Sequence, residues 1–205
     1  MKTLKFNSKE EWLGYRLGKI TGSRLKDIVV KRGTEKKIGF YELIAERLST
    51  DPYGEAFDET PMERGTRLEP EAMEMFEQKT GKKVSRELVI WSLDENEGIA
   101  SSPDGIVSEN EAVEVKCLSS ARHIEAFMKK AIPDEYEFQV LQYFIVNPNL
   151  QKLNVVFYDP RVPSKDFFII EVNRDEKTDE INFYRDYQMN ILKEVDEAVL
   201  KLTNF

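Results

Sequence analysis

The sequence of 205 residues contains one cysteine, Cys117, and one histidine, His123. A single cysteine excludes an internal disulfide, a four-cysteine zinc site and an iron–sulfur cluster. A single histidine excludes multi-histidine zinc sites and leaves little room for a serine or cysteine nucleophile activated by histidine. The ligands of any metal are therefore mostly oxygen atoms, which favours Mg²⁺, Mn²⁺ or Ca²⁺. Among enzymes, hydrolysis by a carboxylate-bound metal is the class that remains.

Long hydrophobic runs are also missing. The longest runs are four residues, as at positions 143–146, whereas a transmembrane helix needs about 20. The first residues lack the apolar stretch of a secretory signal peptide. We therefore expect a cytoplasmic protein that does not associate with a membrane.

The charges are distributed unevenly along the chain. The 38 acidic residues outnumber the 30 lysines and arginines, which gives a net charge of −8. Residues 1–40 nevertheless hold eleven basic and four acidic side chains. A basic first fifth on an acidic protein favours binding of a polyanion at one face. The alternative is a solvated, lysine-rich surface.

Length and hydrophobic content, at 40% of the residues, predict one domain over residues 1–205 with a sizeable core. Periodicity predicts helices first and then a sheet with further helices around it. We expect a mixed β-sheet flanked by helices, an α/β (α+β) fold. The predicted helices lie at 8–17, 21–29, 40–48, 61–81, 119–130, 134–146 and 175–202, and the strands at 84–91, 98–101, 106–108, 112–117, 152–158 and 166–172.

The helix predicted from Pro61 contains an unusual segment, Arg64-Gly65-Thr66-Arg67-Leu68-Glu69-Pro70. Glycine and proline inside a helical pattern break propensity rules, and such exceptions are frequent at functional sites. Glu69 is therefore a candidate functional carboxylate. The alternative is an ordinary exposed glutamate on a helix.

The segment with the clearest chemistry is Ser101-Ser102-Pro103-Asp104-Gly105, followed by Glu114-Val115-Lys116. Residues two apart on a strand share a face, so Glu114 and Lys116 point the same way, and the predicted hairpin returns that face to Asp104. Such a cluster of charges is costly unless something neutralises it.

A hard divalent cation bridging Asp104 and Glu114 would neutralise the cluster, and the Val115 carbonyl can supply a further oxygen. Lys116 would then lie beside a metal-bound water, where its ammonium would stabilise hydroxide or, if the cations lower its pKa, its neutral amine would accept a proton. The alternative is a surface hairpin with paired charges.

Five motifs in order resemble the lambda exonuclease family of viral recombination nucleases, a YqaJ-like group of the PD-(D/E)xK type. The motifs are W-x3-R-x-G-x-I-T-x-S from Trp12 to Ser23, R-G-x3-E from Arg64 to Glu69, S-P-D-G from Ser102 to Gly105, E-x-K-C from Glu114 to Cys117, and Q-x2-Q-Y from Gln139 to Tyr143. The similarity continues through residues 158–161 and 174–177, so it covers nearly the whole chain.

The resemblance implies a restriction-endonuclease-like core and a 5′→3′ exonuclease on double-stranded DNA. Its implied parts are a basic helical N-terminal part (1–48), a catalytic core (61–172) and a C-terminal helix (175–202). It implies two Mg²⁺ ions per active site, with Mn²⁺ as a substitute. Asp104, Glu114 and the Val115 carbonyl correspond to metal ligands, Glu69 to a helper for the second metal, and Lys116 to the residue acting on the nucleophile.

By the same resemblance, four residues correspond to positions that hold the 5′-phosphate: Arg16, Ser23, Ser102 and Gln142. The helix start at Thr21-Gly22-Ser23 also offers free backbone N–H groups to a phosphate. Further implications are a homotrimeric ring, a single-strand annealing protein as partner, and phage or prophage recombination in a bacterial host. The alternatives are an endonuclease or a RecB-like nuclease of other polarity, and a non-catalytic module that binds DNA ends.

Overall fold

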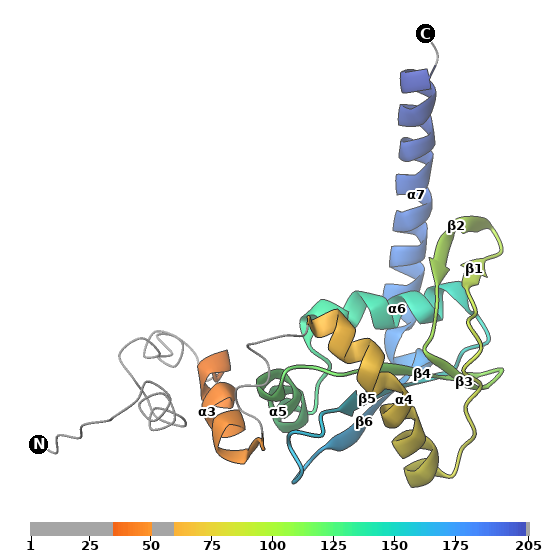
Figure 1. Cartoon of the computed structure of the whole chain (residues 1–205). Coiled ribbons are helices and arrows are strands. Elements are labelled where there is room, and N and C mark those ends of the chain that lie inside the picture. Colours follow the sequence, from red (N-terminus) through yellow and green to blue (C-terminus); the bar gives the residue numbers. More distant parts are fainter. Residues whose placement is uncertain (1–34, 51–59, 204–205) are drawn as a thin grey trace, which may run out of the picture. The chain divides into compact units, whose positions relative to one another are not determined.

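The computed structural model describes residues 35–50 and 60–203 (Figure 1). The predicted helices at 8–17 and 21–29 lie outside these residues. No helix in the described ranges is both long enough and apolar enough to span a membrane. The described elements are α3 (Ile38–Leu48), α4 (Pro61–Thr80), β1 (Trp91–Leu93), β2 (Asn96–Ser101), β3 (Gly105–Ser108), β4 (Glu111–Lys116), α5 (Ser120–Lys129), η2 (Asp134–Tyr136), α6 (Glu137–Val146), β5 (Lys152–Tyr158), β6 (Phe167–Asn173), η3 (Arg174–Lys177) and α7 (Thr178–Thr203).

The described residues divide into two compact units. The first contains residues 35–50, 60–72, Lys116–Ala131 and Phe157–Phe168, and the second contains Met73–Val115, Ile132–Val156 and residues 169–203. Helix α4 and three of the strands begin in one unit and end in the other. A single nuclease domain over residues 1–205, with the three parts given above, stays a prediction.

Helix α4 begins and ends where local sequence signals predict. Thr60 and Glu63 form a capping box: the Thr60 hydroxyl accepts from the Glu63 N–H, and the Glu63 carboxylate accepts from the Thr60 N–H at 2.8 Å. At the other end, Gly81 has a φ of +71°, and its N–H donates to the Glu77 carbonyl. Leu68 and Phe76 are buried as their spacing predicts.

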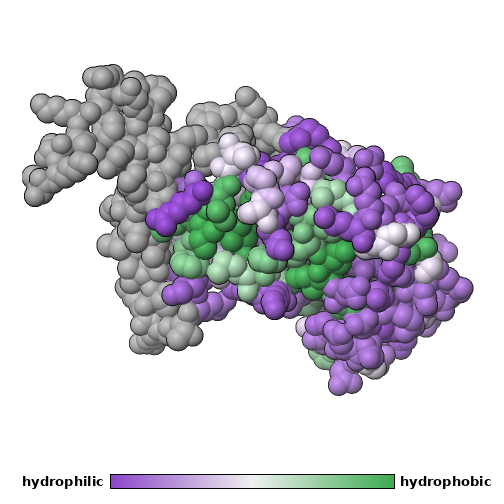
Figure 2. Space-filling model, turned by 90° about the horizontal axis from the view of Figure 1, so that it is seen from below, coloured by the Kyte–Doolittle hydropathy of each residue, from purple (hydrophilic) through white to green (hydrophobic). Residues whose placement is uncertain are grey.

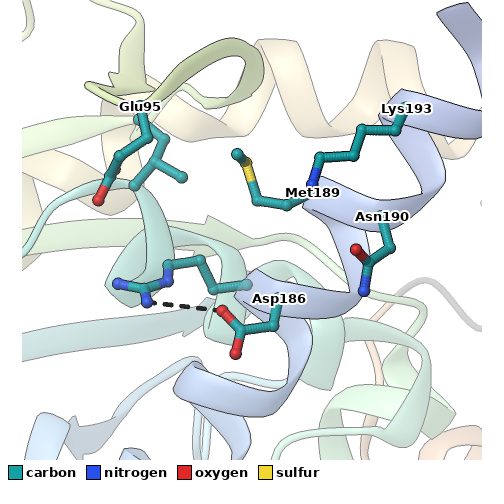
Figure 3. A pocket seen from close by; sticks show the side chains of 7 residues that line it. Glu95, Asp186, Met189, Asn190 and Lys193 are labelled. Carbon is teal, nitrogen blue, oxygen red and sulfur yellow. Dashed lines mark hydrogen bonds and ion pairs between the residues drawn. The ribbon is translucent and has the colours of Figure 1, made fainter.

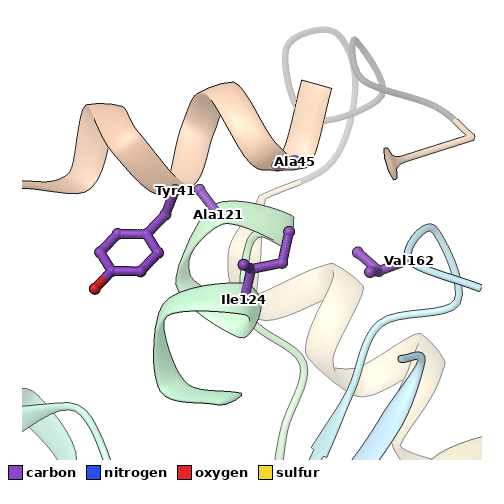
Figure 4. Packing of buried hydrophobic residues seen from close by; sticks show 5 residues of the cluster. All are labelled: Tyr41, Ala45, Ala121, Ile124 and Val162. Carbon is purple, nitrogen blue, oxygen red and sulfur yellow. The ribbon is translucent and has the colours of Figure 1, made fainter. Parts of the chain in front are cut away.

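In the first unit, α3 packs against α5 through a small apolar cluster (Figure 4). Tyr41 and Ala45 of α3 meet Ala121 and Ile124 of α5, with Val162 beside them. The side chain of Ser119 caps α5 by accepting from the Arg122 N–H, as the predicted helix start requires. The segment that directly follows Lys116 is thus held by a packed helix.

His123 of α5 is fully buried in the first unit, consistent with a structural role. Its Nε2 lies 2.8 Å from the Lys165 carbonyl, and its ring makes an edge contact with Phe168, which stacks on Phe157. Within the described residues, its Nδ1 atom is buried without a hydrogen-bond partner. Burial lowers the pKa of His123 below its ordinary value, although the hydrogen bond to Lys165 opposes the shift.

Stability should therefore fall in acid because of His123. With a folded-state pKa below the unfolded value of about 6.5, the imidazole stabilises the fold fully above pH 6.5, and this contribution is lost as pH falls towards the folded-state pKa. One proton gives a slope of at most about 1.4 kcal/mol per pH unit. Urea unfolding between pH 7.5 and 5 should show a decline that His123→Gln removes. Equal slopes for the two proteins would contradict this origin.

The second unit contains most of a four-stranded sheet with the order β3-β4-β5-β6. Strands β3 and β4 pair antiparallel, with Gly105 opposite Val113. Position 105 requires glycine because a Cβ atom there would lie 2.4 Å from a methyl carbon of Val84 and 2.9 Å from the Met73 side chain. The absence of a side chain at Gly105 therefore allows the chain next to Asp104 to pack closely against Val84 and Met73.

Helix α6 lies beside the β1–β2 hairpin and beside α7 in the same unit (Figure 1). Its buried side chains include Tyr143 and Phe144. Arg174 ties the helix end to η3, since its guanidinium donates to the carbonyls of Phe144 at 2.8 Å and Asn147 at 3.2 Å. Helix α6 is thus held at its end by Arg174 and lies beside the hairpin that leads into the turn at Asp104.

One sequence-based prediction needs correction. Residues 84–90 form no strand beyond a single bridge from Ser85 to Ile106, and Leu88 and Ile90 are exposed. A run of β-favouring residues pairs only if a neighbouring strand is available along its length, and here pairing resumes only at Trp91.

The last helix, predicted at 175–202, is present as α7, and several of its large apolar side chains are exposed. Ile181 is buried, whereas Ile191 and Val195 are exposed, together with Phe183 and Tyr187. Figure 2 shows hydrophobic residues among hydrophilic ones on the face that it draws. Helical periodicity predicts the helix itself, which is present, but not whether its apolar face is covered.

Candidate active site

The turn between β2 and β3 holds Asp104 against strand β4. Its Oδ2 atom accepts a hydrogen bond from the Val115 N–H at 2.7 Å. The carboxylate is half-buried, and the strand residue preceding Val115 is Glu114. The hairpin therefore brings the first two predicted carboxylates to one place, as the turn and strand pattern predicts.

Glu114 is buried, with 3% of its surface exposed, and both of its carboxylate oxygens accept hydrogen bonds from α6. Its Oε1 atom accepts from the Gln139 amide at 2.7 Å, and its Oε2 atom accepts from the Tyr143 hydroxyl. The pKa of Tyr143 is raised by burial, by the negative charge of Glu114 and, to a smaller extent, by that of Asp104. The field of both carboxylates thus reaches the tyrosine.

Two of the predicted phosphate-binding residues lie at the end of β2 and on α6. Ser102 is exposed, and its hydroxyl donates to the Val89 carbonyl at 2.6 Å. Gln142 donates to the Ala100 carbonyl at 3.4 Å and accepts from Gln188 of α7 at 3.0 Å. The other two, Arg16 and Ser23, lie outside the described residues.

Lys116 and Glu69 belong to the first unit, where two arginines hold the peptide groups that follow Lys116. Arg64 of α4 donates to the Cys117 carbonyl at 3.0 Å, and Arg161 donates to the Leu118 carbonyl at 3.2 Å. Arg64 is five residues before Glu69, so the contact ties the Glu69 helix to the segment after Lys116.

The Arg161 side chain is itself fixed by Asp159, which is fully buried. The guanidinium Nε lies 2.7 Å from Oδ1, and the Ser120 hydroxyl donates to Oδ2 at 2.6 Å. Burial alone would raise the pKa of Asp159, but the hydrogen bonds and charge of Arg161, with the bond from Ser120, hold it below its ordinary value. The ion pair is a structural anchor at the end of β4.

The three predicted carboxylates are divided between the two units. Across residues 35–50 and 60–203, no group of three or more acidic, histidine or cysteine side chains is arranged to hold a metal ion. Asp104 and Glu114 come together in the second unit, while Glu69 belongs to the first. The two acids and the Val115 carbonyl supply hard oxygen donors of the kind that Mg²⁺ and Mn²⁺ prefer, so this donor set fits a divalent cation.

Sequence reasoning assigned no separate role to Gln139, Tyr143 or Arg64, although all three stand inside the quoted motifs. Residues four apart on a helix share a face, so Gln139 and Tyr143 could have been paired with each other from the sequence. Their common target, Glu114, is 25 residues or more away along the chain. Local spacing carries no signal for that contact.

A separate pocket of about 370 Å³ lies in the second unit between the β1–β2 turn and α7 (Figure 3). Arg185 and Asp186 form an ion pair in its wall at 3.5 Å. None of the predicted site residues lines it. The lining residues are Leu93, Glu95, Arg185, Asp186, Met189, Asn190 and Lys193.

Comparison with known families matches residues 11–148 to the YqaJ-like viral recombinase domain. The chain belongs to this family. The match covers most of the sequence and confirms the resemblance that the order of the motifs indicates.

Solved structures agree with this family and confirm the α/β fold class. The crystal structure of an alkaline exonuclease (LHK-Exo) from Laribacter hongkongensis is 30% identical, with a TM-score of 0.61, over 94% of this chain and 97% of that chain. The structure of LHK-Exo in complex with dAMP is 29% identical with the same TM-score and the same coverage. No curated protein matches the sequence significantly.

Proposed function

We propose that this YqaJ-like chain is a Mg²⁺-dependent nuclease that degrades one strand of double-stranded DNA from a 5′-phosphorylated end. Cleavage in the 5′→3′ direction would leave a 3′ single-stranded overhang for recombination. The observation that carries the proposal is that the Asp104 carboxylate is held on the Val115 N–H, directly beside the buried Glu114 in the chain. The similarity to an alkaline exonuclease that has been crystallised with dAMP supports the same class of substrate.

The proposed ligands of the divalent cation are Asp104, Glu114 and the Val115 carbonyl, with Glu69 assisting a second ion. When bound, Mg²⁺ polarises a phosphoryl oxygen and lowers the pKa of water. Lys116 follows Val115 directly, and its side chain would orient the attacking water as an ammonium or take its proton as a neutral amine. The carbonyl contacts of Arg64 and Arg161 restrict the backbone next to Lys116, which favours a fixed position for its side chain.

We further propose that Arg16, Ser23, Ser102 and Gln142 hold the 5′-phosphate of the strand that is cut. Mn²⁺ would substitute for Mg²⁺. A homotrimeric ring and a single-strand annealing protein are the proposed assembly and partner, as the family resemblance implies.

Digestion of linear duplex DNA labelled separately at each 5′ and each 3′ end tests polarity. With Mg²⁺, the 5′ labels should be released first, and EDTA should stop the reaction. A covalently closed circular duplex is the control, since an endonuclease cuts it and an exonuclease does not. Release from the 3′ end would indicate a nuclease of other polarity. Binding of DNA ends without any cleavage would indicate a non-catalytic module.

The 5′-phosphate should control the first cut. A terminal phosphate supplies about two negative charges, which an arginine fork and neutral donors can fix in place. Such positioning can lower the activation free energy of cleavage by several kcal/mol. Duplexes with 5′-hydroxyl ends should therefore be cut at least about tenfold more slowly. The test is single-turnover, because later cuts regenerate a 5′-phosphate. Gln142→Leu should shrink the difference, and equal initial rates on the two ends for the wild type would refute the phosphate pocket.

A further inference from the structure

We propose that Gln139 and Tyr143 are positioning residues that hold the Glu114 carboxylate in a fixed orientation for a divalent cation. The inference rests on the proposed function, and it assigns a task to two side chains that the motif comparison leaves without one. The contacts that carry it all lie within the second unit, on β4 and α6.

The geometry is that of a two-point clamp. Gln139 donates to one oxygen of Glu114, and Tyr143 donates to the other, so the carboxylate cannot rotate without breaking a hydrogen bond. The Gln139 amide nitrogen also lies 3.3 Å from the Tyr143 hydroxyl oxygen. The two donors are four residues apart on one helix and therefore move together.

The clamp is itself anchored on both sides. Tyr143 is 1% exposed, and its ring makes an edge contact with Trp91 at the start of β1. Its hydroxyl also lies 3.0 Å from the Ser102 carbonyl, two residues before Asp104. The same hydroxyl thus contacts both Glu114 and the chain that leads to Asp104.

The clamp donors are uncharged, and this decides what they can do. An arginine or lysine in their place would neutralise the carboxylate and compete with a cation. An amide and a phenol fix its direction and leave its negative charge available. Residues that hydrogen-bond to metal ligands in this way typically change metal affinity by 10- to 100-fold when they are removed.

The test measures Mn²⁺ binding by calorimetry on the full chain without DNA. Tyr143→Phe removes the hydroxyl and keeps the ring, and Gln139→Leu removes the amide at an exposed position where folding is not at risk. Each variant should bind Mn²⁺ about tenfold more weakly. The concentration of Mg²⁺ needed for half-maximal cleavage should rise by the same factor, and saturating Mg²⁺ should restore the rate.

Tyr158→Phe is the matched control. Tyr158 is also a buried tyrosine whose hydroxyl bonds to a carboxylate, that of Glu71 in the first unit. Its removal should reduce stability by an amount similar to that of Tyr143→Phe and leave Mn²⁺ affinity unchanged. A purely structural role for Tyr143 would make the two variants behave alike.

Unchanged Mn²⁺ affinity in Gln139→Leu and Tyr143→Phe, or no Mn²⁺ binding by the wild type, would overturn the inference. A loss of cleavage that saturating Mg²⁺ does not restore would also overturn it, since the side chains would then act on the reaction directly. If the wild type binds Mn²⁺ but cuts no DNA, the proposed nuclease function fails. In that case the Mn²⁺ affinities of Gln139→Leu and Tyr143→Phe still test whether the two residues position Glu114.

Discussion

Glu114→Gln should reduce the cleavage rate of linear duplex DNA by roughly a hundredfold or more, because the site would lose one of the two charges proposed to hold the cation. The fold should persist. The amide oxygen of the substituted side chain can still accept one hydrogen bond. The Tyr143 hydroxyl keeps an acceptor as well, because the Ser102 carbonyl oxygen lies 3.0 Å from it. Thermal unfolding should therefore shift little, while single-turnover cleavage with Mg²⁺ is nearly lost.

Glu111→Gln provides the control for this variant. Glu111 lies on the same strand and accepts hydrogen bonds from Lys82 and from the Asn154 amide, so the same substitution disturbs a comparable network. Its variant should retain cleavage. Mg²⁺-dependent activity of Glu114→Gln above about a tenth of the wild-type rate would show that the side chain is not an essential ligand.

Lys116→Ala should lower turnover by about two orders of magnitude or more while DNA binding is preserved. The reason is that we propose Lys116 to act on the attacking water, whereas the carboxylate-bound cations and the phosphate pocket would hold the DNA. The measurement pairs single-turnover cleavage in Mg²⁺ with fluorescence anisotropy of a labelled duplex under non-cleaving conditions. The affinity should change by no more than about threefold, as expected for the loss of one charge contact.

Lys152→Met is the control for removing one positive charge. Lys152 lies on β5 and pairs with Glu171 at 3.1 Å, an exposed ion pair of small energetic value. Its variant should cleave and bind like the wild type. A collapse of DNA affinity in Lys116→Ala as large as the loss of turnover would identify Lys116 as a phosphate clamp rather than a group that acts on the nucleophile.

The sequence alone predicted the elements whose signals are local. Strand β5 was predicted at its observed bounds, because its apolar run of four residues is followed by a proline-containing loop. Helix α4 followed from apolar spacing between a first-turn proline and Gly81. The turn at Asp104 and the strand at Glu114 were also predicted from local signals. Their succession predicted that the hairpin returns the strand to Asp104, and the Asp104 carboxylate does accept a hydrogen bond from the Val115 N–H.

The tertiary structure decided what depends on partners far away in the chain. Residues 84–90 have strand-forming composition but lack a neighbour along their length, and Val195 of α7 is exposed although its helix is amphipathic. The clamp on Glu114 joins side chains 25 and 29 residues apart. Periodicity reports which face of an element is apolar, because it arises from backbone geometry within a few residues. Which groups then meet depends on the packing of whole elements, and that is set by contacts that no local pattern encodes.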